Sequence, residues 1–224
     1  LARTQAARAA LARGDEAAAN AHLEAFGDRH PAARALQRAR QALALGRPGE
    51  ALLALDVPAA QPLPPSGLRL RAEALAASGR SIEAYGLLGA LRQQQALPAA
   101  TLDALQREWA AQSLQQAADA NALADRWDAL PEPLRTSPPV VSAYASRAAA
   151  MNWDEAATRS LEHALDAQWD ESLVGLYGQL PVSRLEHRRA QVERWHGVLD
   201  EAERLHLAAV RDAQALAALS AQME

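Results

Sequence analysis

The sequence predicts an all-α fold of stacked helical hairpins, and three observations lead to this prediction. Half of the 224 residues are apolar but only 4% are aromatic, so we expect a core made mainly of Ala and Leu. Both are strong helix formers, because they lose little side-chain freedom in a helix. The β-branched and aromatic residues typical of strands are scarce. The third observation is a set of glycines that recur at nearly equal distances along the chain.

The glycines Gly14, Gly46 and Gly79 are 32 and 33 residues apart, and an alanine follows each of them five residues later. A glycine ends the first helix of a hairpin well, because it adopts a left-handed conformation without steric cost. An alanine at the later position lets the second helix cross the first closely. A tetratricopeptide repeat is a helical hairpin of about 34 residues. The spacing therefore predicts three degenerate tetratricopeptide repeats over residues 1–100.

A looser fourth copy of this pattern is expected after Pro138 and Pro139, which precede its first helix. Met151 replaces the glycine, and Ala156 is the small residue five positions later. Between the third and fourth copies we expect an irregular unit. We expect its first helix to be capped by Thr101 and to cover about 102–118. Its second helix is expected to start at Asn121 and to be ended by Pro131 and Pro133.

Beyond the fourth copy we expect three more helices, at about 171–179, 183–197 and 200–222. Residues 101–224 are thus predicted to continue one solenoid with less regular repeats. The whole chain would hold about five to six antiparallel hairpins in a right-handed superhelix with a concave groove. A proline cluster is the best candidate for a linker or bend and comprises Pro58, Pro62, Pro64 and Pro65.

Composition narrows the function classes. The net charge is −4, which argues against wholesale nucleic-acid binding. The absence of Cys removes disulfides, thiolate metal sites and thiol nucleophiles together. No uncharged stretch approaches the roughly 20 apolar residues of a membrane-spanning helix.

A search for catalytic motifs finds neither a nucleotide-binding glycine loop nor a nucleophile elbow. The carboxylates alternate with Arg at helical spacing, as in Glu155 with Arg159 and Glu193 with Arg189, which predicts surface ion pairs. No two of the six histidines lie three or four residues apart, so no helix presents a metal-binding pair. We therefore predict a protein that is not an enzyme and has no metal site.

The second half of the chain carries a further signal in an ordered series of aromatic motifs. These motifs are Arg107-Glu108-Trp109, Arg126-Trp127-Asp128-Ala129-Leu130-Pro131, Val141-Ser142-Ala143-Tyr144-Ala145, Trp153-Asp154-Glu155-Ala156, Gln168-Trp169-Asp170 and Leu173-Val174-Gly175-Leu176-Tyr177-Gly178. In this order they resemble the C-terminal domain of the HemY-type tetratricopeptide proteins of proteobacterial haem biosynthesis.

The resemblance implies a soluble domain on the cytoplasmic side of the inner membrane, anchored by N-terminal helices that would precede residue 1. It also implies a scaffolding role with late haem-biosynthesis enzymes as partners. Two alternatives remain open. One is a haem- or porphyrin-binding regulator or carrier, in which a single histidine could ligate haem. The other is an envelope tetratricopeptide protein unrelated to haem, for instance one that serves polysaccharide export.

The predicted groove supplies the candidate binding residues. The repeat register places Arg8, Arg40, Arg69 and Glu73 on the inward face of the first helices. Arg suits the bidentate recognition of carboxylates, so a partner's acidic side chains, its C-terminus or a porphyrin's propionates could bind there. Ordinary surface arginine is the competing interpretation.

The tryptophans are expected mainly to pack between helices, above all Trp109, Trp127 and Trp153. Trp169 and Tyr177 are eight residues apart and are the alternative candidates for lining a groove that takes an apolar or planar ligand.

Overall fold

The computed structural model describes residues 2–24, 31–181, 186–198 and 200, and in these ranges it contains helices, turns and loops but no strand. The predicted all-α fold is thereby confirmed. The chain divides into two compact units, Leu1–Tyr177 and Gly178–Glu224.

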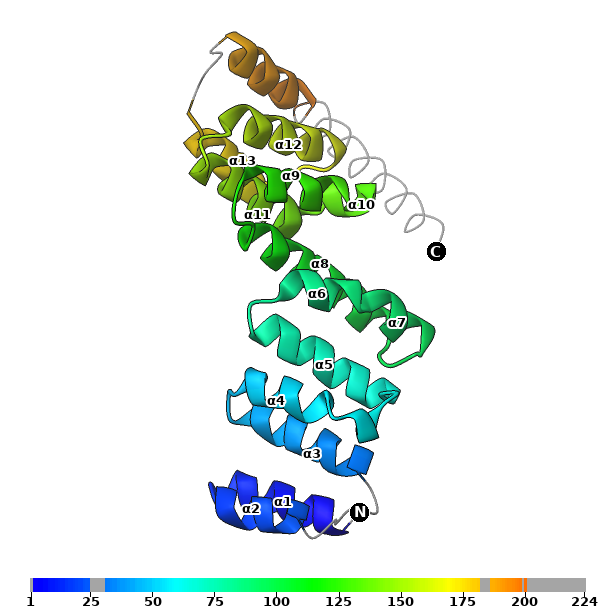
Figure 1. The fold of residues 1–224 in the computed structure, drawn as a ribbon. Helices are drawn as coiled ribbons and strands as arrows, with labels where there is room; N and C mark the ends of the chain where they lie inside the picture. The colour runs from blue at the N-terminus through cyan, green and yellow to red at the C-terminus, as the bar shows by residue number, and fades with distance from the viewer. Residues whose placement is uncertain (1, 25–30, 182–185, 199, 201–224) are drawn as a thin grey trace, which may run out of the picture. The chain divides into compact units, whose positions relative to one another are not determined.

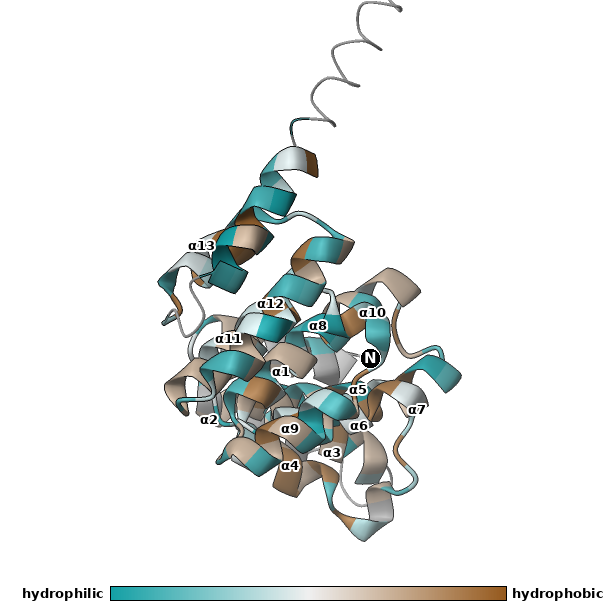
Figure 2. Ribbon diagram, turned by 90° about the horizontal axis from the view of Figure 1, so that it is seen from above, coloured by the Kyte–Doolittle hydropathy of each residue, from teal (hydrophilic) through white to brown (hydrophobic). Residues whose placement is uncertain are grey.

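The first unit is a succession of short helices, each of which packs on its neighbours (Figure 1). Hydrophobic and hydrophilic residues are interspersed along them, as expected for amphipathic helices (Figure 2). The helices are α1 Ala2–Ala12, α2 Glu16–Glu24, α3 Pro31–Ala44, α4 Pro48–Leu55, the 3-10 helix η2 Pro58–Ala60, α5 Pro65–Ala77, α6 Ser81–Gly86, α7 Leu88–Gln93, α8 Ala99–Gln115, α9 Ala120–Asp128, α10 Glu132–Arg135, α11 Pro138–Ala150, α12 Asp154–Ala167 and α13 Glu171–Gln179.

The three glycines of the repeat pattern occupy the same turn. Gly14, Gly46 and Gly79 have φ values of +76°, +70° and +75°. After Gly46 the Arg47 amide donates to the Ala42 carbonyl at 2.8 Å, while the Gly46 amide donates to Leu43 at 3.0 Å. These two bonds form a Schellman motif, which satisfies carbonyls at the end of α3. The predicted hairpin turns are therefore confirmed at all three glycines.

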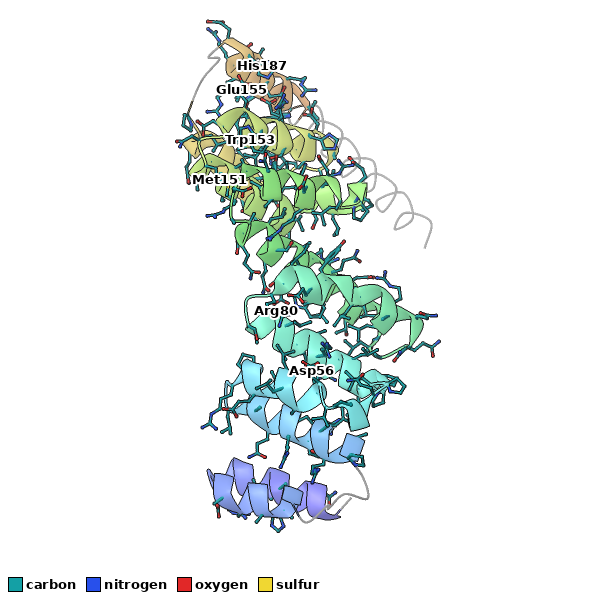
Figure 3. The ribbon with its side chains drawn as sticks, in the orientation of Figure 1. Asp56, Arg80, Met151, Trp153, Glu155 and His187 are labelled. Atoms are coloured by element: carbon teal, nitrogen blue, oxygen red, sulfur yellow. The ribbon has the colours of Figure 1, made fainter. Side chains whose placement is uncertain are left out.

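The fourth copy has the same turn, but one residue later than predicted. Met151 has φ −98°, whereas Asn152 has φ +58°, and the Trp153 amide donates to the Ala148 carbonyl at 2.8 Å. The prediction that Met151 replaces the glycine is thus wrong, because Asn152 does. Asn is the non-glycine residue that enters the left-handed region most readily. Met151 and Trp153 lie on either side of it at the α11–α12 turn (Figure 3).

Buried alanines lie at fixed distances on both sides of each hairpin turn. Five residues after each left-handed residue lies an alanine with no exposed surface, and seven residues before it lies another that is at most 4% exposed. The first set is Ala19, Ala51, Ala84 and Ala157, and the second is Ala7, Ala39, Ala72 and Ala145. With the corrected register the fourth hairpin therefore follows the same rule through Ala157, not through Ala156 as predicted.

The second and third hairpins share one hydrophobic core with α8. Successive helices contact one another from α3 through α4, α5 and α6 to α8, and then from α8 through α11 to α12. One hydrophobic cluster of buried residues runs from Ala35 in α3 to Trp109 in α8. Nearest-neighbour packing of this kind is what a helical solenoid requires.

The segment between α4 and α5 packs on the core through Ala60 and Leu63, whereas Pro58, Pro62 and Pro65 of the proline cluster are exposed. Ala60 and Leu63 belong to the buried cluster. A Cβ atom added to Gly67 in the first turn of α5 would lie 3.1 Å from Leu36 Cδ2, so α5 approaches α3 closely here. Arg71 Nη1 also donates to Asp56 Oδ1 at 2.6 Å, which ties α5 to the end of α4. The segment is a compact connection within the first unit.

The irregular unit starts and ends at other residues than predicted. Helix α8 begins at Ala99 after Pro98 and not after Thr101, and the Asp119 carboxylate caps α9 by accepting from the Ala122 amide at 2.8 Å. Asp is as good a cap as Asn, and Asp119 lies two residues before Asn121 in the sequence. Pro131 precedes a further short helix, α10.

Two arginines satisfy carbonyls near the end of α8. Arg147 donates from Nη2 to the Ala117 carbonyl at 2.6 Å, and Arg126 donates to the Ser113 carbonyl. Because helix C-termini carry unpaired carbonyls and a partial negative charge, these guanidinium groups fit their position. They tie α9 and α11 to α8.

The predicted helix at 171–179 is confirmed as α13. In the second unit the structure describes a helix over 186–198, which matches the predicted 183–197 to within three residues. Within that unit Arg188 Nη1 donates to the Leu180 carbonyl at 2.8 Å. The predicted helix at 200–222 lies outside the described residues except for residue 200.

Substitution of Gly79 by Ala tests the turn. The added Cβ meets no atom within 4 Å, so the cost is the left-handed backbone alone, about 1 kcal/mol of unfolding free energy. Gly89→Ala in α7 is the matched control, since its Cβ also has open space and its φ is not left-handed. We expect Gly89→Ala to leave stability unchanged or raise it by up to about 1 kcal/mol. Urea denaturation followed by circular dichroism would measure the unfolding free energies of both variants. Equal changes in the two variants would contradict a left-handed turn at Gly79.

Candidate functional site

Three of the predicted groove residues lie together. Arg40 from α3 and both Arg69 and Glu73 from α5 line a cavity of about 380 Å³. Leu43, Ser66 and Leu70 complete its lining. These side chains come from the first helices of the second and third hairpins, which pack against each other. The repeat register therefore identified residues that share one cavity.

The cavity carries two guanidinium groups and one carboxylate. Arg69 Nε donates to Glu73 Oε1 at 2.7 Å, and both side chains remain substantially exposed. This i,i+4 pair orients the Arg69 guanidinium and occupies only its Nε edge. A guanidinium has five N–H donors, so its outer nitrogens remain able to bind a ligand's carboxylate.

Of the other predicted groove residues, Trp169 and Tyr177 do not line this cavity. Arg8 lies in α1, and its side chain is outside the described part of the structure. Tyr177 is only 3% exposed, and its hydroxyl donates to Glu162 Oε1 at 2.8 Å. Trp169 follows α12 and is 39% exposed. The burial of Tyr177 argues against its predicted role as a groove residue, because its ring packs in the interior.

The tryptophans predicted to pack behave differently from one another. Trp109 is 3% exposed and belongs to the core, as predicted. Trp127 stacks on Tyr144, with ring centroids 4.0 Å apart and an angle of 23° between the planes. Trp153 is 39% exposed at the α11–α12 turn, so the prediction that it packs between helices is wrong (Figure 3).

A second cavity, which the sequence analysis missed, has a volume of about 290 Å³ and lies among α9, α10, α11 and α12. Its lining combines the aromatic pair with several charged or polar side chains. These residues are Trp127, Asp128, Glu132, Arg135, Tyr144, Ala156, Arg159, Ser160 and His163. The sequence signals were the aromatic motifs that contain Trp127 and Tyr144 and the i,i+4 spacing of Arg159 and His163, which places the latter two on one face of α12.

Glu132 is the hub of a small polar network at this cavity. Its Oε1 lies 2.6 Å from His163 Nε2, and its Oε2 lies 2.9 Å from Arg135 Nη2. The hydrogen bond from His163 lowers the pKa of the Glu132 carboxyl below its ordinary value of 4.5, and the positive charge of Arg135 acts in the same direction. The network joins α10 to α12.

Tyr144 forms part of the cavity wall and is only 5% exposed. Burial raises the pKa of its hydroxyl, and the nearby charge of Asp128 raises it further, while Arg159 lowers it. The hydroxyl is therefore neutral at physiological pH and able both to donate and to accept a hydrogen bond.

Two other features were sought among the described residues. No group of three His, Asp or Glu side chains lies close enough together to hold a metal ion. None of the helices described is both long and apolar enough to cross a membrane.

The predicted ion pair between Arg189 Nε and Glu193 Oε1 is present, at 2.9 Å.

The Glu132 network makes stability pH-dependent. A lowered carboxyl pKa contributes stability above the unfolded-state value of 4.5, and this contribution is lost as the pH falls through the folded-state pKa. The difference in thermal midpoint between the wild type and Glu132→Gln should therefore shrink below about pH 4.5. Glu171→Gln, at an exposed carboxylate outside the cavity, controls for the loss of one negative charge. A difference that does not vary between about pH 3 and 6 would rule out this linkage.

Comparisons with known proteins give no assignment. No family model matches the chain, no curated protein matches its sequence, and no solved structure matches its fold.

Proposed function

We propose that this protein is a non-catalytic scaffold that binds other proteins through the groove formed by the first helices of its hairpins. The observation that carries the proposal is the shared cavity of Arg40, Arg69 and Glu73. It lies between the first helices of two consecutive hairpins. In a solenoid, side chains from neighbouring repeats line one surface and can bind the same ligand.

The proposal includes the repeat type. The spacing of 32 and 33 residues and the repeated left-handed turn support tetratricopeptide repeats. The alanines that flank each turn support them as well, because small residues allow the two helices to cross closely. Units of this kind stack into a right-handed superhelix whose concave side is lined by first helices. On that basis Arg40 and Arg69 belong to the concave side.

The chemistry of the cavity favours an acidic partner segment. Arg40 and Arg69 provide two guanidinium groups at its wall, and Arg binds carboxylates through paired hydrogen bonds. Leu43 and Leu70 add apolar surface beside these charges. A peptide with an acidic side chain or a C-terminal carboxylate next to an apolar residue would complement both.

The partners we propose are late haem-biosynthesis enzymes, with the protein held at the cytoplasmic face of the inner membrane. This part rests on the resemblance of the aromatic motifs between residues 107 and 178 to HemY-type proteins. Affinity capture with the full-length protein tests it. Enrichment of enzymes that act on porphyrins supports the proposal, and capture of partners with no such enzyme among them contradicts it.

Charge reversal tests the groove itself. In the double variant Arg40→Glu, Arg69→Glu we expect the affinity for captured partners to fall at least about tenfold, since two carboxylate-binding groups become repulsive. The double variant Arg13→Glu, Arg107→Glu is the matched control, because it reverses the same number of charges at exposed sites outside the cavity. Fluorescence polarisation with a labelled acidic peptide from a captured partner measures both. Equal affinity of the wild type and the groove variant would remove this site.

A further inference from the structure

We propose that the second cavity, among α9, α10, α11 and α12, is a binding site for a free α-amino acid with an apolar or aromatic side chain. The site lies on different hairpins from the Arg40–Arg69 cavity. It does not depend on protein binding there. Four properties of its lining lead to this ligand.

The first property is an aromatic wall. The rings of Trp127 and Tyr144 are stacked with centroids 4.0 Å apart, and both residues line the cavity. Two stacked rings form a larger and more rigid apolar surface than either ring alone. Ala156 adds a small apolar side chain from α12. A ligand's hydrocarbon or aromatic group would bury its surface against this wall.

The second property is a hydroxyl that lacks a partner. Tyr144 is 5% exposed, yet its hydroxyl forms no hydrogen bond with any described residue. The hydroxyl is not among the buried side-chain atoms that lack a partner, so it is open to solvent, and its residue lines the cavity. Tyr177 shows the usual arrangement in the same unit, since its hydroxyl is bonded to Glu162. The Tyr144 hydroxyl is therefore available to a ligand.

The third property is a pair of opposite charges without ion-pair partners. Asp128 and Arg159 both line the cavity, and within the described part of the chain neither forms a salt bridge or a side-chain hydrogen bond. Asp128 raises the pKa of the Tyr144 hydroxyl and Arg159 lowers it, and all three residues line the same cavity. Glu132, by contrast, is already held by His163 and Arg135. The cavity thus combines one carboxylate, one guanidinium and one neutral hydroxyl, none of which is bonded to another described side chain.

This charge pattern selects a zwitterion. A ligand with only a negative charge would be attracted by Arg159 but repelled by Asp128. A ligand with only a positive charge would be attracted by Asp128 but repelled by Arg159. An α-amino acid carries an ammonium and a carboxylate on one carbon, so it can satisfy Asp128 and Arg159 together. The Tyr144 hydroxyl can donate to the carboxylate or accept from the ammonium.

The fourth property is size. The volume of about 290 Å³ lies at the small end of ligand cavities, which span roughly 300–1,000 Å³. A single amino acid fits a cavity of this volume, whereas a larger cofactor does not. The aromatic wall then prefers a side chain such as that of phenylalanine or leucine.

Isothermal titration calorimetry of the full chain with L-phenylalanine tests the proposal. We expect L-phenylalanine to bind saturably at one site per chain. N-acetyl-L-phenylalanine, which lacks the ammonium, should bind at least about tenfold more weakly. L-phenylalaninamide, which lacks the carboxylate, should lose affinity to a similar extent. No heat of binding with either L-phenylalanine or L-leucine would overturn the proposal. Equal binding of the N-acetyl compound would also overturn it, because Asp128 would then have no role.

Single substitutions assign the site. Arg159→Gln, Asp128→Asn and Tyr144→Phe should each weaken the binding of L-phenylalanine at least about tenfold, while circular dichroism shows unchanged helix content. Tyr144→Phe keeps the stacked ring and removes only the hydroxyl. Arg107→Gln on α8 is the control for loss of an exposed arginine and should bind like the wild type. Binding that survives all three cavity substitutions would place the ligand elsewhere and refute the assignment.

Discussion

The packing of two short helices through buried positions that hold alanine is the interaction on which each hairpin of this protein depends. Ala39 and Ala51 show it in the second hairpin and Ala145 and Ala157 in the fourth, all with no exposed surface. Alanine contributes little apolar area by itself, so the stability must come from repetition of the contact along the chain. The left-handed residue at the turn sets the register, because it fixes how far each alanine lies from the helix end.

Much of this register could be predicted, since it depends on residues close together in the sequence. Gly46 is informative because few residues tolerate its conformation. Asn152 is less informative, since Asn occurs in many other settings, and the fourth hairpin was therefore placed one residue too early. The cap at Asp119 was missed for a related reason: Asp119 and Asn121 are equally good caps, and only packing against α8 decides between them.

The two cavities differ in how far sequence could reveal them. Arg40 lies six residues before Gly46 and Glu73 six residues before Gly79, so the repeat register indicates that they share a cavity, and Arg69 lies four residues before Glu73 on the same face of α5. The second cavity joins side chains from Trp127 to His163 on four helices, and its contacts span as much as the 31 residues between Glu132 and His163. Helical periodicity carries no information on such contacts. It also could not show that Tyr177 turns inward.

The second cavity lies where the regular repeat is interrupted. The short helices α9 and α10 stand between α8 and α11, and α8 packs directly on α11 as one hairpin packs on the next. The two short helices are therefore not the link between α8 and α11. They supply Trp127, Asp128 and Glu132, while the solenoid helices supply Tyr144 and Arg159. An insertion that leaves the stacking intact while adding charged and aromatic side chains beside it can acquire a ligand site without disturbing the core.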